Sequence, residues 1–280
     1  MRHPWLAALS AALSEAGFGL LLWLGLSVAL VSHSAQMPAL RALQLCAVVL
    51  ALLLLAIAAV GAALAPTEGR GVRALLRAPT RWHVRRNALV AVAALLAGLV
   101  GALLAWVAPG ATRASLLGIG GLVLALAALG TVASGALAQA GSPDGRSRQF
   151  AVPIRLLSAM QGGLALTFAL MAGLFAVGRE GTGMFAILAV LGVLLALASV
   201  LDWREVDRTA PDGRRLPATR LRIATGMLLA GVPLLALGTA SALGGVPAWL
   251  WIVALASLAG ILLERRLHLA ATPEPIPAVA

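Results

Sequence analysis

Eight apolar stretches follow one another along the chain, and each is about as long as a lipid bilayer is thick. They lie at roughly 14–34, 43–66, 88–108, 114–138, 153–178, 182–202, 221–243 and 246–263. About 20 residues of apolar helix cross a hydrocarbon core of roughly 30 Å. Lipid offers the backbone no hydrogen-bond partners, so a spanning segment must pair its own polar groups as a helix. We therefore predict an all-α integral membrane protein, a bundle of about eight transmembrane helices.

Composition supports a lipid environment for most of the chain. Hydrophobic residues make up 61% of the 280 residues and charged residues only 11%, whereas a soluble domain carries about 25% charged residues. The lipid bilayer is thus the first expected partner. We assign residues 1–268 to one transmembrane domain. Residues 269–280 contain three prolines, which exclude a regular helix, and we predict a disordered tail there.

The basic residues are all arginines, and they are distributed unequally between the connections. Of the 21 arginines, 18 lie before the first stretch, after the last, or in or beside the connections after the second, fourth and sixth. This group includes Arg155 and Arg265. The other side has only Arg41, Arg113 and Arg179. The positive-inside rule then predicts a multi-pass protein of the bacterial inner membrane with both termini cytoplasmic. The net charge of +11 reflects topology and lipid headgroup contacts, and we expect no nucleic-acid partner.

Cysteine and histidine usage gives no sign of a metal site. Cys46, in the second stretch, is the single cysteine; it cannot form an internal disulfide, and we predict a small buried hydrophobe. A haem anchor needs histidines within spans that face one iron, and none of the four histidines lies in mid-stretch. No spacing typical of zinc ligands occurs. We expect this chain to bind no cofactor of its own.

Two polar residues lie within the apolar stretches and are candidates for function. Glu15 lies near the start of the first stretch. It could accept a proton, but a carboxylate near a helix N-terminus is also favoured by the helix dipole. Gln161 lies near the middle of the fifth stretch, beside two glycines. We interpret it as a hydrogen-bonding residue at a close helix contact rather than as a ligand-binding residue.

Three scattered sequence patterns occur in the same order and at similar spacing in one known family of membrane proteins. In the first stretch the pattern consists of Ser14, Gly17, Phe18, Gly19 and Leu20. The connection after the second stretch contains Arg73-Ala74, Trp82 and Arg85, and the sixth stretch is followed by Asp202-Trp203-Arg204-Glu205-Val206-Asp207. The length and the number of stretches also fit. The patterns are spread over about three quarters of the chain, and together they resemble the membrane-anchor subunits of dimethyl sulfoxide reductase-type molybdoenzymes.

The resemblance implies a non-catalytic subunit of an oxidoreductase complex. Such an anchor holds an iron–sulfur subunit and a molybdopterin catalytic subunit and passes electrons to them from membrane quinol, either menaquinol or ubiquinol. It implies partner docking through Arg73, Arg77, Trp82, Arg204 and Asp207. The residues that it suggests for a quinol site are Glu15, Glu68, His83 and Arg85.

Two departures from the family pattern concern the groups that would deprotonate quinol. Relatives carry a histidine at the end of the second span, where this chain reads Ala62-Ala63-Leu64-Ala65-Pro66. They also carry a glutamate just before the third span, where this chain has Arg86. Quinol oxidation releases two protons and needs a base near each hydroxyl. Glu68 and His83 are the candidates to replace the missing bases, and a degenerate quinol site is the other option.

Two other classes of function stay open. The first is a small-molecule transporter or permease of the inner membrane. Transporters often contain inverted repeats and broken spans with polar groups at the midplane, whereas this sequence shows no clear repeat and few midplane polar residues besides Gln161. The second is a structural or assembly protein without a ligand. We rank the anchor first.

Overall fold

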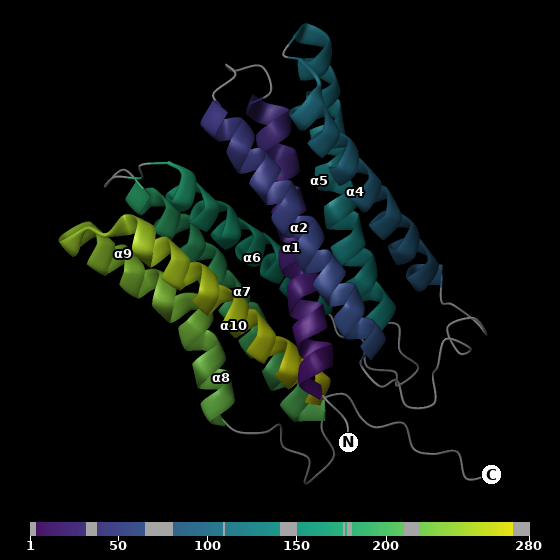
Figure 1. Cartoon of the computed structure of the whole chain (residues 1–280). Helices are drawn as coiled ribbons and strands as arrows, with labels where there is room; N and C mark the ends of the chain where they lie inside the picture. The colour runs from purple at the N-terminus through teal and green to yellow at the C-terminus, as the bar shows by residue number, and fades with distance from the viewer. Residues whose placement is uncertain are drawn as a thin grey trace.

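The computed structural model describes residues 4–31, 38–64, 81–108, 110–140, 150–175, 177, 181–209 and 219–270, and within these ranges the regular structure is entirely helical. Eight helices are long and apolar enough to cross a membrane. The predicted all-α bundle is therefore confirmed, and the chain is a multi-pass membrane protein. Figure 1 shows the helices side by side, with the start of the first helix and the end of the last at one end of the bundle, which we call the terminal end.

Each span is one continuous helix except the seventh. The first six are α1 (Pro4–Val31), α2 (Pro38–Leu64), α4 (Arg81–Trp106), α5 (Ala111–Ala140), α6 (Ala151–Leu174) and α7 (Thr182–Thr209). The seventh consists of α8 (Thr219–Gly226), the π-helical turn η2 (Met227–Gly231) and α9 (Val232–Leu243), and the eighth is α10 (Val246–Ala270). Residues 271–280 of the predicted tail lie outside the described residues.

The spans form two groups of four that share one packing order. In the first group α1 packs against α2 and α5, and α4 packs against α2 and α5. In the second group α6 packs against α7 and α10, and α9 packs against α7 and α10. The groups meet where α1 contacts α6 and α10, and they diverge away from the terminal end (Figure 1). The same arrangement thus occurs twice although the sequence shows no clear repeat.

Glycines bring the backbones of the two groups into direct contact. A Cβ atom added at Gly19 of α1 would lie 1.7 Å from the Ala159 carbonyl oxygen of α6. One added at Gly163 would lie 2.0 Å from the carbonyl carbon of Gly19. Residues without side chains permit such close crossings, which strengthen van der Waals packing between membrane helices. The crossing of α1 and α6 holds the two groups together.

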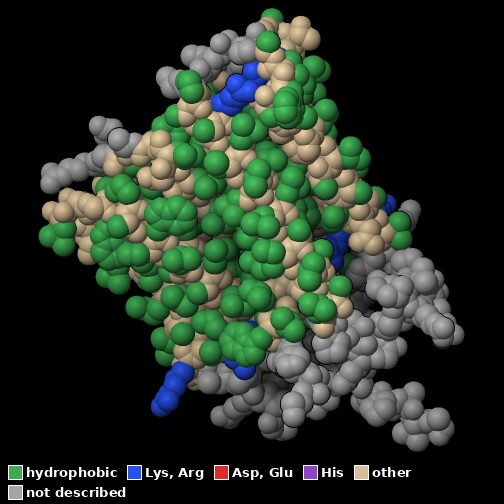
Figure 2. All heavy atoms as spheres, in the orientation of Figure 1, with side chains coloured by type: hydrophobic (Ala, Val, Ile, Leu, Met, Phe, Trp, Pro, Cys, Tyr) green, Lys and Arg blue, Asp and Glu red, His purple; other side chains and the backbone are tan. Residues whose placement is uncertain are grey.

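Many large apolar side chains are exposed on the outer surface of the bundle, as expected for contact with lipid. Figure 2 shows an almost continuous hydrophobic surface, with basic side chains gathered at the two ends of the molecule. Cys46 lies on this outer surface and is exposed. The predicted burial of Cys46 is wrong because α2 packs inward through another face, which carries Ala47, Ala51, Leu54 and Ala58.

Two arginines of the sparsely charged side cap the C-terminal end of α4. Arg41 donates from Nε to the Leu104 carbonyl at 2.7 Å and from Nη2 to the Ala105 carbonyl at 2.8 Å. Arg113 donates from Nη2 to the Leu104 carbonyl at 3.4 Å. The last carbonyls of a helix lack partners within the helix and carry partial negative charge. Arg41 and Arg113 therefore have a structural role, which explains why they lie on the side that otherwise has few arginines.

Gln161 compensates for a missing backbone hydrogen bond in the seventh span. Pro233 has no N–H to donate to the Leu229 carbonyl four residues earlier. The Val232 N–H bonds to the Met227 carbonyl five residues back, which forms the π-helical turn. The Gln161 amide, fully buried, donates to the Leu229 carbonyl at 2.9 Å. The prediction that Gln161 hydrogen-bonds across helices is confirmed.

Replacing Gln161 by leucine is expected to lower the free energy of unfolding by about 1–2 kcal/mol, because the Leu229 carbonyl loses its partner in an apolar site. Pro233→Ala restores a backbone N–H, so the same glutamine substitution should cost less in that background. Unfolding titrations in mixed micelles of all four variants measure this coupling. Equal costs in both backgrounds would show that Gln161 does not compensate for the proline.

Candidate functional site

Four charged side chains from three helices meet inside the bundle near its terminal end. We call Glu15 of α1, Arg155 of α6, and Glu264 and Arg265 of α10 the charge cluster. Arg265 donates from Nε to Glu15 Oε2 at 2.9 Å, and Arg155 Nη1 lies 3.0 Å from Glu15 Oε1. Arg265 Nη1 lies 3.3 Å from Glu264 Oε2. Two negative and two positive side chains thus balance one another.

The charge cluster is shielded from the surroundings of the bundle. Glu15, Glu264 and Arg265 are 3%, 1% and 1% exposed. Arg265 also donates from Nη2 to the hydroxyl of Ser158 at 3.3 Å. Neither carboxylate oxygen of Glu264 has a hydrogen-bond partner among the residues that the structure describes. Removing charges from water costs free energy unless each one is paired. The charge cluster is therefore the feature of the interior whose burial costs most.

Further ionisable residues surround the charge cluster. Arg86, near the start of α4, interacts electrostatically with Glu15. Asp202 of α7 interacts electrostatically with Glu264 and Arg265. Its Oδ2 atom lies 4.0 Å from Nδ1 of His268. Charges from both four-helix groups therefore converge at the terminal end.

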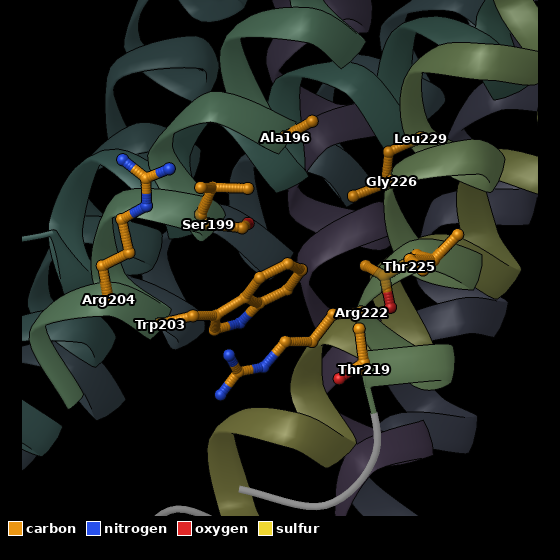
Figure 3. Close-up of a pocket in the computed structure, with 11 residues that line it drawn as sticks. Ala196, Ser199, Trp203, Arg204, Thr219, Arg222, Thr225, Gly226 and Leu229 are labelled. Atoms are coloured by element: carbon orange, nitrogen blue, oxygen red, sulfur yellow. The ribbon is translucent and has the colours of Figure 1, made fainter. Parts of the chain in front are cut away.

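A pocket of about 380 Å³ lies beside this region, between α7 and the α8–η2 segment. Ser199, Trp203 and Arg204 line it from α7, and Arg222, Thr225 and Gly226 line it from α8. Figure 3 shows the Trp203 indole between Ser199 on one side and the guanidinium of Arg222 on the other. The Arg222 Cζ atom lies 5.6 Å from the Trp203 ring centroid. The pocket combines an apolar wall with a polar end.

The polar end of the pocket is held by an ion pair. Arg222 donates from Nη1 and Nη2 to the two carboxylate oxygens of Asp207 at 2.7 and 2.8 Å. This two-point contact fixes the guanidinium plane. The Nε atom of Arg222 and the hydroxyl of Ser199 are buried without hydrogen-bond partners among the described residues. Both atoms are enclosed within the protein.

The structure describes the side chains of only two of the four residues suggested for quinol, Glu15 and Arg85. Glu15 lies in the charge cluster, and Arg85 is exposed at the start of α4, next to Arg86. His83 lies in the first turn of α4, where the structure describes only the backbone, and Glu68 lies outside the described residues. The helix-dipole interpretation of Glu15 is wrong, because α1 begins at Pro4 and the dipole effect is confined to the first turn.

The residues suggested for docking likewise divide into those whose side chains the structure describes and those whose side chains it does not. Arg204 and Asp207 lie exposed on the last turns of α7. Trp82 lies in the first turn of α4, where the structure describes only the backbone, and Arg73 and Arg77 lie outside the described residues. Sequence reasoning missed Glu264 and treated Arg155 and Arg265 as headgroup contacts, whereas both arginines are buried. Among the described residues no group of three or more His, Cys, Asp or Glu side chains could hold a metal ion.

The fold and this site define a class: an eight-span membrane protein with a buried charge cluster and a lateral pocket at its terminal end. Comparisons with protein-family models, with curated proteins and with solved structures find no match. The class therefore rests on the residues and geometry described above.

Proposed function

We propose that this chain is the membrane-anchor subunit of a molybdopterin oxidoreductase complex of the dimethyl sulfoxide reductase type in the bacterial inner membrane. It would hold an iron–sulfur subunit and a catalytic subunit at its terminal end, on the cytoplasmic side. The eight-span fold and the three sequence patterns support this assignment. One of these patterns, residues 202–207, lies at the end of α7.

The observation that carries the proposal is the corner formed by residues 202–209 of α7 and 219–223 of α8, which the Arg222–Asp207 ion pair joins. A helix of 28 residues is about 42 Å long at roughly 1.5 Å per residue, whereas the hydrocarbon core measures about 30 Å. Since the charged residues of α7 lie in its last turns, these turns would extend beyond the lipid chains. The Arg222–Asp207 ion pair ties them to α8. The corner presents Arg204, Glu205 and Arg208 on an exposed surface, which suits a polar partner.

Charge reversal at the corner tests the docking. Replacing both Arg204 and Arg208 by glutamate should reduce the amount of iron–sulfur subunit that co-purifies after gentle detergent extraction by about tenfold or more, because like charges at an interface cost several kcal/mol. Replacing the same residues by lysine preserves the charge and should retain the partner. Quantitative mass spectrometry of the extracted complex measures both. Equal retention in the two double variants would contradict docking at this corner.

The electron path follows from the chemistry of quinol. Oxidation of one quinol releases two electrons and two protons. The electrons would pass to the clusters of the iron–sulfur subunit held at the corner, and the two protons would be released to the water at the terminal end. The pocket lies at this corner, since Trp203, Arg204 and Arg222 belong to both. A reductant bound there would be close to the partner, which favours direct transfer.

A permease is the second candidate, and one observation favours it. The two four-helix groups share the same packing order, and the seventh span is interrupted by a π-helical turn and Pro233. Repeated halves and irregular spans are typical of transporters. Solute uptake by proteoliposomes that contain this chain alone would favour a permease. Failure of uptake together with stable retention of an iron–sulfur subunit would favour the anchor.

A further inference from the structure

We propose that the pocket between α7 and the α8–η2 segment holds one acyl chain of an anionic phospholipid, whose phosphate is bound by Arg204 and Arg220. This inference goes beyond the proposed function and involves no partner subunit. A reductant that reached the pocket from the bilayer would have to displace this acyl chain. The evidence is the lining of the pocket, the position of its opening and the charges beside that opening.

The lining of the pocket suits a hydrocarbon chain. Almost all of its accessible wall is apolar, and the indole of Trp203 extends across one side (Figure 3). The lining on α7 runs from Ala196 to Arg204, a distance of about 12 Å at roughly 1.5 Å per residue. An acyl chain in contact with these walls gains dispersion contacts that an empty pocket lacks. The volume of about 380 Å³ therefore favours a chain that lies along the helix.

The opening of the pocket faces the bilayer between Val200 of α7 and Ile223 of α8. Both residues line the pocket and are also exposed on the outer surface of the bundle. About 20 residues of helix cross the hydrocarbon core, and counted from Thr182, where α7 begins, these residues end at Leu201. The opening therefore lies near the edge of the hydrocarbon core, at the depth where the chains of a phospholipid join its headgroup.

An exposed arginine lies one helical turn from each side of the opening, toward the terminal end. Arg204 follows Val200 by four residues on α7, and Arg220 precedes Ile223 by three residues on α8. Residues three or four apart share a helix face, and α7 ends where α8 begins, at the terminal end (Figure 1). The order from the bilayer outward is thus an apolar opening followed by two cations, which matches the order of chain and phosphate in a phospholipid.

The charges of Arg204 and Arg220 are not balanced within the corner. The two other arginines of the corner each pair with a carboxylate of α7, whereas Arg204 and Arg220 have no such partner among the described residues. Figure 3 shows the guanidinium groups of Arg204 and Arg222 pointing apart. The guanidinium fork matches the geometry of phosphate, and basic sites between membrane helices bind anionic headgroups. Two unpaired cations therefore favour an anionic lipid over a zwitterionic one.

Trp203 provides a reporter for the test, because bromine atoms on a lipid chain quench the fluorescence of a nearby indole. The full chain is placed in phosphatidylcholine vesicles that contain a small share of brominated lipid, either phosphatidylglycerol or phosphatidylcholine. Subtracting the quenching measured for Trp203→Phe isolates the contribution of the pocket. Brominated phosphatidylglycerol should bind about twentyfold more strongly than brominated phosphatidylcholine, with about fivefold from each arginine.

Three arginine variants with the same change in net charge test the headgroup site. Arg204→Gln and Arg220→Gln should each lower the preference for phosphatidylglycerol about fivefold. Arg208→Gln is the control, because Arg208 pairs with Glu205 and does not line the pocket. It should lower the preference less than twofold. Equal losses in all three variants would show a general charge effect and overturn the proposal.

A matched pair of glycine variants tests the acyl chain. A Cβ atom added at Gly226, or at Gly238 of α9, meets no atom within 4 Å. Gly226 lines the pocket, whereas Gly238 does not. Gly226→Leu fills the pocket and should reduce the quenching of Trp203 by either brominated lipid about fivefold or more, whereas Gly238→Leu should leave it within twofold. Thermal unfolding checks that each variant is folded. Unchanged quenching in Gly226→Leu would overturn the proposal.

Two further results would contradict the lipid site. Displacement of the brominated lipid by soluble glycerol phosphate would identify a phosphate site that holds no chain. Absence of quenching of Trp203 by either lipid is the result expected if a second copy of this chain covered the pocket. Because no partner subunit is present, these results are independent of docking at the α7–α8 corner. Retention of an iron–sulfur subunit without lipid selectivity would remove the lipid site and leave the proposed function.

Discussion

Replacing Arg265 by methionine is expected to lower the free energy of unfolding in lipid by about 3–5 kcal/mol, because it leaves two buried carboxylates with Arg155 as the one positive charge remaining in the charge cluster. Arg265 contacts both Glu15 and Glu264, and all three side chains are almost completely enclosed. Methionine has a similar length and fills much of the space, so the loss reports the charge rather than a cavity. Unfolding titrations in mixed micelles give the change.

Arg266 provides the matched control for this substitution. It is the next residue on α10, is only partly buried, and stacks on Trp5 with its Cζ atom 3.7 Å from the ring centroid. Arg266→Met should cost no more than about 1 kcal/mol, the usual contribution of an accessible cation–π contact. The double variant Glu15→Gln/Arg265→Gln removes both charges of one pair and should be more stable than Arg265→Met. Similar losses in Arg265→Met and Arg266→Met would contradict the structural role of the charge cluster.

Replacing Gly163 by alanine is expected to destabilise the contact between the two four-helix groups by about 1–3 kcal/mol or more. The added methyl carbon would lie 2.0 Å from the carbonyl carbon of Gly19, and a backbone cannot move aside as a side chain can. The α1–α6 crossing must therefore open. The measurement is the free energy of unfolding, together with the yield of monodisperse protein.

At Gly173, on the same helix, substitution by alanine is expected to have the opposite effect on stability. A Cβ atom there meets only Trp251 Cζ2, at 3.8 Å, which is an ordinary contact. Alanine is a better helix former than glycine by about 0.5–1 kcal/mol, so Gly173→Ala should be neutral or slightly stabilising. If both alanine variants changed stability by the same amount, the close crossing at Gly163 would carry no special weight.

The sequence contained enough information for the spans but not for the ends of the helices. Hydropathy placed the first span at 14–34, whereas α1 begins at Pro4, so the first ten residues of the helix were missed. It ended the last span at residue 263, whereas α10 continues to Ala270. The charged residues 264–266 belong to the helix because Glu264 and Arg265 are paired inside the bundle. The sequence signal that could have revealed this extension is a helical pattern that continues through the adjacent, oppositely charged Glu264 and Arg265.

The charge cluster could not be predicted from arginine counts. A count assigns every arginine to one side of the membrane, but it does not distinguish Arg155 and Arg265, which face Glu15, from arginines that face headgroups. That distinction depends on which helices cross, and the crossing depends on glycine contacts between residues 144 positions apart in the sequence, Gly19 and Gly163. The pocket likewise depends on how α7 and the α8–η2 segment are spaced, so Ser199 and Gly226 carried no sequence signal.

The most direct test of the proposed function is electron transfer through the assembled complex. The purified complex of this chain with its iron–sulfur subunit is placed in proteoliposomes, a hydroquinone with a ten-carbon tail is added, and cluster reduction is followed by electron paramagnetic resonance. We expect reduction when this chain is present and none with the iron–sulfur subunit alone. Clusters that stay oxidised in an intact complex, or the failure of any iron–sulfur subunit to bind, would contradict the proposal.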